Sequence, residues 1–194
     1  RMTHPTHRLL AAAIVLAMCV HPPVVRADAE PAAPAPSEVQ TAASQAAMTR
    51  AQALDRLREG NARFVANVAR HDGFTSPARR LELAAGQEPF AIILGCSDSR
   101  VPAELVFDQG LGDLFVIRVA GNIVASSQVG SVEFAASRFG TPLVVVLGHS
   151  QCGVILATLE ELRQPSDQQS RNLRSIVDRV RPSVETLLAT GLRD

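Results

Sequence analysis

The sequence contains no lysine, no tryptophan and no tyrosine, although 19 of its 194 residues are basic. Every basic residue is therefore arginine, which excludes mechanisms that need a lysine, such as P-loop phosphate binding and Schiff-base chemistry. A tyrosine general acid and an indole stacked on a base or sugar are excluded in the same way. The 19 acidic residues balance the arginines, so the net charge gives no sign of a nucleic-acid partner. The hydrophobic content of 46% fits one globular domain with a short appendage.

The first thirty residues differ in kind from the rest. Arg1 and Arg8 precede an uninterrupted apolar run over residues 9–20, and the cleavage-site patterns Val25-Arg26-Ala27 and Ala27-Asp28-Ala29 follow. This layout is typical of a secretory signal peptide, which we assign to residues 1–29. The apolar run is shorter than the ~20 residues of a membrane-spanning helix. We therefore expect a periplasmic or secreted protein without a permanent membrane anchor, rather than one held by this run or by a lipid on Cys19.

Two further regions follow the predicted signal peptide. Residues 30–48 consist mostly of Ala, Pro, Ser and Gln, and such a segment cannot bury enough apolar surface to offset the entropy of ordering it. We predict a flexible linker there. The folded domain is predicted over residues 49–194, and it begins with Thr49 as the cap of a helix whose apolar pattern is interrupted by Gly60 and Asn61.

The apolar pattern of this domain predicts its fold class. Three apolar runs are predicted as buried strands, over residues 90–94, 114–119 and 143–147. Segments with helical pattern lie around them, over residues 78–85, 101–107, 126–139, 153–163 and 173–188. Strands that alternate with helices pair in parallel, so we predict an α/β fold with a central, mainly parallel sheet and helices on both faces.

The residues with the most distinctive chemistry follow two of these strands. Cys96, Asp98 and Arg100 come after the first strand, and His149 and Cys152 come after the third. Both segments are expected at the carboxyl ends of parallel strands, the usual ligand-binding edge. Two thiolates and one imidazole suit Zn(II), and three protein ligands leave a fourth position for water, as in catalytic zinc sites. Cys152 is expected at the opening turn of a helix, where the dipole favours a thiolate.

A disulfide between Cys96 and Cys152 is the alternative for the two cysteines, because an exported protein meets an oxidising compartment. It leaves His149, Asp98 and Arg100 without a role. His71 is the only other histidine after residue 29, and we consider it either a proton shuttle or, preferably, an exposed loop residue. Arg118 interrupts an apolar strand, which favours a buried ion pair or a subunit-interface role over a catalytic one.

Cys96-Ser97-Asp98-Ser99-Arg100 and Gly148-His149-Ser150-Gln151-Cys152-Gly153 resemble the zinc-site signature of the β-class carbonic anhydrases. Further matches lie over residues 86–89 and 115–122. The resemblance implies Cys96, His149 and Cys152 as ligands of one Zn(II) per chain, and Asp98 and Arg100 as a catalytic dyad. It also implies Gln87 and Phe115 as substrate-pocket residues, which in that family meet from two subunits of a dimer.

The resemblance further implies an activity: the reversible hydration of carbon dioxide to bicarbonate and a proton, by zinc-bound hydroxide assisted by Asp98 and Arg100. A homodimer or a larger homo-oligomer is expected. Hydrolysis of carbon disulfide or carbonyl sulfide at the same site is one alternative, and a non-catalytic zinc-bound or disulfide-bonded scaffold is another.

The sequence departs from the family pattern at three points. The tryptophan and tyrosine that some members use for a separate inhibitory bicarbonate site are missing, so we expect that regulation to be absent. Phe134 stands where a tyrosine often lines the pocket. The family's domain usually continues past the helix predicted over 173–188 into another strand, so we expect either a chain truncated at its C-terminus or a smaller sheet.

Overall fold

The computed structural model describes residues 48–70, 75–165 and 170–190. The predicted signal peptide, nearly all of the predicted linker and His71 lie outside these ranges. The described elements are α2 (Arg50–Val65), α3 (Pro77–Leu83), β1 (Ala91–Cys96), α4 (Ala103–Val106), β2 (Leu114–Val119), the 3-10 helix η1 (Ala120–Asn122), α5 (Ser126–Phe139), β3 (Val144–Leu147), α6 (Gly153–Arg163) and α7 (Arg171–Leu188). None of the helices in these ranges is long and apolar enough to cross a bilayer.

The three strands form a parallel sheet in the order β2-β1-β3, which confirms the predicted fold class. All residues of the central strand β1 are buried, whereas the edge strand β3 alternates between exposed and half-buried residues. The predicted first strand was placed too early, since β1 extends to Cys96, whose register partner is Val119. Cys96 is therefore the last residue of a strand and shares the rigidity of the sheet.

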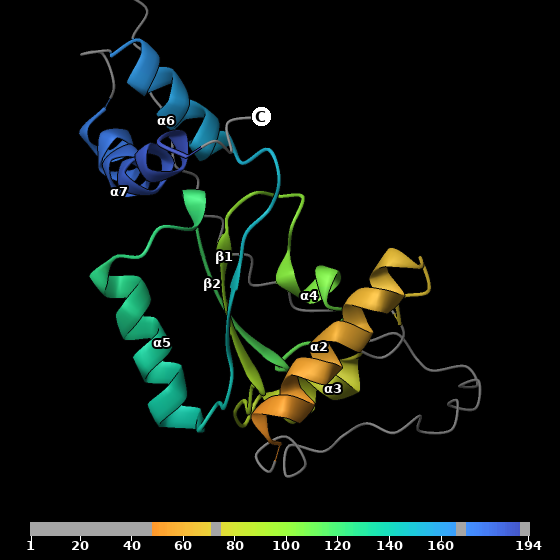
Figure 1. The fold of residues 1–194 in the computed structure, drawn as a ribbon. Helices are drawn as coiled ribbons and strands as arrows, with labels where there is room; N and C mark the ends of the chain where they lie inside the picture. Colours follow the sequence, from red (N-terminus) through yellow and green to blue (C-terminus); the bar gives the residue numbers. More distant parts are fainter. Residues whose placement is uncertain (1–47, 71–74, 166–169, 191–194) are drawn as a thin grey trace, which may run out of the picture. The chain divides into compact units, whose positions relative to one another are not determined.

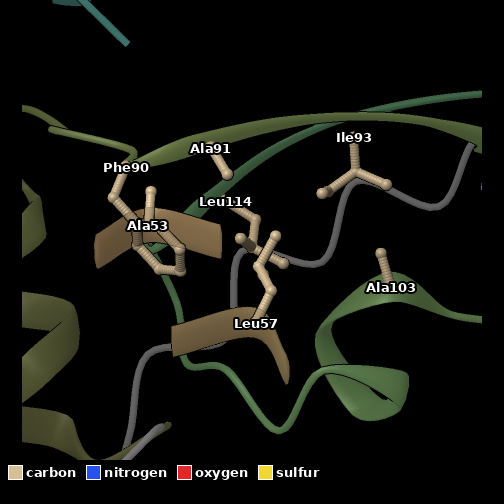
Figure 2. Close-up of a cluster of buried hydrophobic side chains, with 7 residues drawn as sticks. All are labelled: Ala53, Leu57, Phe90, Ala91, Ile93, Ala103 and Leu114. Atoms are coloured by element: carbon tan, nitrogen blue, oxygen red, sulfur yellow. The ribbon is translucent and has the colours of Figure 1, made fainter. Parts of the chain in front are cut away.

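Helices cover both faces of the sheet, as predicted (Figure 1). On one face, Ala53 and Leu57 of α2 and Ala103 of α4 pack against residues of β1 and β2 (Figure 2). On the other face, Ala135 of α5 packs against a second cluster that contains Ile92, Leu94 and Ile117. Helix α4 is shorter than the predicted segment over 101–107, because the chain is still extended at Pro102, the N-cap.

Helix α2 continues through the two residues that interrupt its sequence pattern. It begins at a capping box formed by Thr49 and Gln52, as expected from the sequence. Gly60 is buried, and a Cβ atom at this position would collide with the backbone carbonyl of Phe107. Asn61 donates a hydrogen bond from Nδ2 to the Val106 carbonyl at 3.0 Å. Both residues are therefore explained by the close approach of α2 to the end of α4.

Replacing Gly60 with alanine is expected to lower the free energy of unfolding. Overpacking costs about 1–3 kcal/mol. Because the collision is with backbone and cannot be relieved by a rotamer change, we expect the upper part of this range, above the ~1 kcal/mol that alanine gains over glycine in a helix. Urea denaturation followed by circular dichroism measures the difference. Gly130→Ala in α5 is the matched control, because a Cβ there meets nothing within 4 Å; this variant should be as stable as the parent or more so. A Gly60→Ala chain as stable as the control would contradict the packing described here.

Ion pairs connect α2 to the segment between α4 and β2. The Arg56 guanidinium lies 3.0 Å from the Asp113 carboxylate and 4.2 Å from the centre of the Phe90 ring. Arg63 pairs with Asp108, whose side chain is only 2% exposed. Since a buried carboxylate is costly unless it is paired, these contacts hold α2 in one position against the sheet.

Helices α6 and α7 pack against one another and contact η1. Val177, Val180 and Val184 form the buried stripe of α7. Gly121 of η1 has a φ of +71°, and a Cβ at this position would meet the side chain of Val154 at 2.6 Å. A glycine is needed there for both reasons, and it brings η1 close to the start of α6.

Candidate metal centre

The fold brings Cys96, His149 and Cys152 together at the carboxyl ends of the strands. Cys96 ends β1, His149 follows β3, and Cys152 is the N-cap of α6, close to its expected place at the opening turn. One ligand atom from each residue lies within 4.8 Å of the other two. Both cysteines are free thiols, so the alternative disulfide is not formed in this structure. Three donors far apart in the sequence thus converge on one point.

The histidine of this cluster keeps one ring nitrogen free of hydrogen bonds to the described residues. His149 Nδ1 lies 2.9 Å from the Ser150 carbonyl oxygen. Because a carbonyl only accepts, Nδ1 carries the hydrogen, and in the neutral ring Nε2 is the free acceptor. Nε2 is buried and has no hydrogen-bond partner in the described part of the chain. A buried polar atom without a partner is costly, and a metal ion between Nε2 and the sulfurs would satisfy it.

The surroundings of Cys96 favour its thiolate, the form that binds metals. Burial opposes ionisation of the thiol. The neighbouring His149 ring and the backbone N–H groups of Asp98 and Gly121 outweigh this effect and lower the pKa of Cys96 to about 7. The same sulfur raises the pKa of His149. Two thiolates and one imidazole are a donor set that zinc prefers, so the residues present fit this ion.

Asp98 and Arg100 form an ion pair beside the three donors. Arg100 donates to both carboxylate oxygens of Asp98 at 2.8 Å, from Nε and from Nη2, and its backbone N–H donates to Oδ1 at 3.0 Å. These bonds hold the pKa of Asp98 well below its usual range. Asp98 Oδ2 lies 3.9 Å from His149 Nε2. A carboxylate that stays ionised is therefore kept next to the candidate ligands.

Arg100 also joins the two loops that supply the candidate ligands. Its Nη2 donates to the backbone carbonyl of Gln151 at 3.1 Å. Gln151 has a φ of +52°, an uncommon backbone conformation for a residue with a side chain. The sequence does not reveal this contact, because the acceptor is a backbone carbonyl, which is present whatever side chain the residue carries.

Gln87 and Phe115, the predicted pocket residues, lie elsewhere in the single chain. Gln87 precedes β1, whereas Cys96 ends it, and the five steps of that strand alone span about 17 Å. Phe115 is the register partner of Ile92, about 13 Å along the sheet from the level of Cys96. Phe115 instead neighbours Phe134, with ring centres 6.3 Å apart. One chain does not bring these residues to the metal centre, and their assignment to a pocket stays a prediction.

Two roles were expected for Arg118, a buried ion pair or a subunit interface; the structure contradicts the first, and the second stays a prediction. The residue is exposed, and its guanidinium donates to the backbone carbonyls of Cys96 and Asp98. The interruption of an apolar strand by a charge was the sequence signal for a special role, but it did not reveal the partners. Those partners lie on the neighbouring strand and the loop after it, which only the sheet register brings close.

A parallel sheet with two thiols, an imidazole and an Asp–Arg pair at its carboxyl edge defines an α/β protein with a candidate zinc site. Comparison with known proteins narrows this class. The family model described as carbonic anhydrase matches residues 91–193, more than half of the chain. The chain belongs to the carbonic anhydrase family, and its structural neighbours place it in the β class.

Two relatives are similar over the same stretch. Carbonic anhydrase 2 of Mycobacterium tuberculosis is 48% identical over 128 residues, which cover 66% of this chain and 61% of the relative. Carbonic anhydrase of Mycolicibacterium smegmatis is 47% identical with the same coverage. The matched part of this chain thus spans less than two thirds of the length of these relatives.

Solved structures agree with this family assignment. The β-carbonic anhydrase CafA of Aspergillus fumigatus has a TM-score of 0.51 and 27% identity, with 72% of this chain and 62% of that chain covered. The Coccomyxa β-carbonic anhydrase in complex with acetazolamide has a TM-score of 0.52 and 25% identity, with the same coverage.

Proposed function

We propose that this chain catalyses the reversible hydration of carbon dioxide to bicarbonate and a proton, with one zinc ion held by Cys96, His149 and Cys152. The observation that carries the proposal is the convergence of these three donors within 4.8 Å, next to the ionised pair of Asp98 and Arg100. Zinc, when bound by such ligands, lowers the pKa of water and so supplies an oxygen nucleophile near neutral pH.

The residues of this chain supply orientation and charge. Asp98 is held ionised by Arg100, so it accepts a hydrogen bond from the attacking water and does not donate one. Arg100 fixes the carboxylate against the second ligand loop through the Gln151 carbonyl. The Ser150 carbonyl fixes the tautomer of His149. These contacts orient the attacking oxygen, whereas positioning of the substrate is left to the pocket residues.

A homo-oligomer is part of the proposal. The assigned pocket residues Gln87 and Phe115 lie away from the metal centre of their own chain, and a second copy can bring its own Gln87 or Phe115 to it. Phe134 neighbours Phe115 and is 54% exposed. Exposure of so large an apolar side chain supports a subunit contact at these two residues. Export of the protein is proposed from the sequence of residues 1–29 alone.

Stopped-flow hydration of carbon dioxide, with a pH indicator, tests the proposed activity. The chain is stripped of metal with a chelator and then titrated with zinc. Hydration above the uncatalysed rate is expected to rise in proportion to bound zinc and to saturate at one zinc per chain. A chain that binds zinc at this stoichiometry but leaves the uncatalysed rate unchanged would refute the proposal.

A further inference from the structure

Arg118 is bound to the backbone of the segment that carries the first ligand. Its Nε donates to the Cys96 carbonyl at 2.8 Å, and its Nη2 donates to the Asp98 carbonyl at 2.6 Å. In the sheet register Arg118 pairs with Gly95. The guanidinium therefore reaches beyond the end of β1 to the residues that leave the strand. We call residues 96–100 the ligand loop.

We propose that Arg118 is a positioning residue that holds the ligand loop in the conformation in which the Cys96 sulfur and the Asp98 carboxylate face the same point. The role of this conformation in catalysis rests on the proposed function. The holding of the loop itself does not.

The geometry explains why one arginine is sufficient. The guanidinium is planar and rigid, so its two N–H donors bind two carbonyls in a fixed relation. Hydrogen bonds from a charged donor are shorter and stronger than those between neutral groups. Cys96 and Asp98 are two residues apart, and the chain between them cannot straighten without breaking at least one of the two bonds. A lysine offers a point charge and lacks this fork.

The remaining bonds of the ligand loop show what Arg118 adds. The Ser97 N–H donates to the Val119 carbonyl and the Val101 N–H donates to the Asp98 carbonyl, both at the longer distance of 3.2 Å. Arg100 binds the side chain of Asp98, whereas Arg118 binds its backbone. Two arginines thus hold Asp98: Arg100 from its own loop binds the side chain, and Arg118 from the neighbouring strand binds the backbone.

If the two hydrogen bonds from the Arg118 guanidinium are lost, the ligand loop is expected to open locally, and this opening can be measured without metal. Cys96 is only 5% exposed, so its thiol reacts slowly with an alkylating reagent while the ligand loop is closed. In Arg118→Gln the charge and one half of the fork are lost. Alkylation of Cys96 is then expected to accelerate about tenfold or more, since each tenfold change reflects the loss of about one such bond.

The experiment uses the full chain, stripped of metal, with iodoacetamide as the reagent and mass spectrometry of peptides to read Cys96 separately from Cys152. Arg138→Gln is the control, because Arg138 is an exposed arginine on α5. The control should label like the parent. Arg118→Lys should lie between the parent and Arg118→Gln, and it serves as the test if Arg118→Gln does not fold. Urea unfolding of each variant gives its global stability.

The proposal is supported if Cys96 labelling rises by more than the change in global stability accounts for. It is overturned if Cys96 labelling is unchanged, or if it rises only as much as the lost stability explains. A second readout is zinc affinity by competition with a chromophoric chelator, which should weaken about 10- to 100-fold in Arg118→Gln, as for residues that orient metal ligands. If Cys96 labelling rises selectively in Arg118→Gln but the zinc-loaded parent does not hydrate carbon dioxide, the proposed function is refuted and the role of Arg118 stands. If the parent is active but labelling is unchanged in Arg118→Gln, the role of Arg118 is refuted and the proposed function stands.

Discussion

Replacing Cys96 with serine is expected to weaken zinc binding about 100- to 1,000-fold. Structural zinc sites with four ligands bind with about 10–16 kcal/mol, so one ligand carries roughly 2.5–4 kcal/mol of binding free energy. Serine has nearly the same shape as cysteine, but it does not ionise near neutral pH. Competition with a chromophoric chelator measures the affinity, and Cys152→Ser should lose a similar amount.

Cys19→Ser, measured in a chain that keeps residues 1–29, is the matched control, because Cys19 is the one cysteine of the sequence that is not a candidate ligand. This variant should bind zinc like the parent. Thermal unfolding of the metal-free variants separates loss of a ligand from loss of the fold. Parent-like zinc affinity in Cys96→Ser would remove Cys96 from the ligand set and with it the convergence on which the proposed function depends.

Asp98→Asn is expected to reduce carbon dioxide hydration about 100-fold or more, a typical loss when a group that accepts a proton or hydrogen bond in the reaction is removed. The amide keeps the shape of the side chain. It loses the charge that Arg100 stabilises, and it replaces one acceptor with a donor, so it no longer orients the attacking water in the same way. Stopped-flow rates of the zinc-loaded variant measure the effect.

Zinc content must be measured on the same samples, because Asp98 is not assigned as a ligand and the variant should stay fully loaded. Asp55→Asn is the matched control: Asp55 lies on α2, and its side chain is 64% exposed and paired with Arg58 on the surface. Surface pairs of this kind contribute little, so the control should hydrate carbon dioxide at the parent rate. A fully loaded Asp98→Asn chain with the parent rate would show that the carboxylate has no part in the reaction.

The strands and most helices could be predicted because their signals are local. The predicted strand over 114–119 and the predicted helices over 126–139 and 153–163 agree with β2, α5 and α6 to the residue. Two of the differences arise where a contact distant in sequence decides the conformation. Pairing with Val119 extends β1 to Cys96, and the approach of α4 explains why α2 tolerates Gly60.

The candidate ligands could be identified from the sequence because few residue types bind zinc and few are present. After residue 29 the chain holds two cysteines, Cys96 and Cys152, and two histidines, of which His149 shares a loop with Cys152. The contacts that orient these residues could not be identified in this way. The carbonyls of Ser150 and Gln151 and the N–H of Gly121 belong to the backbone, which every residue possesses.

The sequence by itself determined the fold class and the residue types of the candidate metal ligands. Both follow from local patterns: the spacing of apolar residues, and the polar residues that directly follow a strand. The tertiary structure alone decided which atoms meet. It placed Arg118 against the carbonyls of Cys96 and Asp98, and it kept Gln87 and Phe115 at the other end of the sheet. The physical reason is that hydrogen bonds and packing act over a few ångströms, and only the register of β1, β2 and β3 determines which distant residues come within that range.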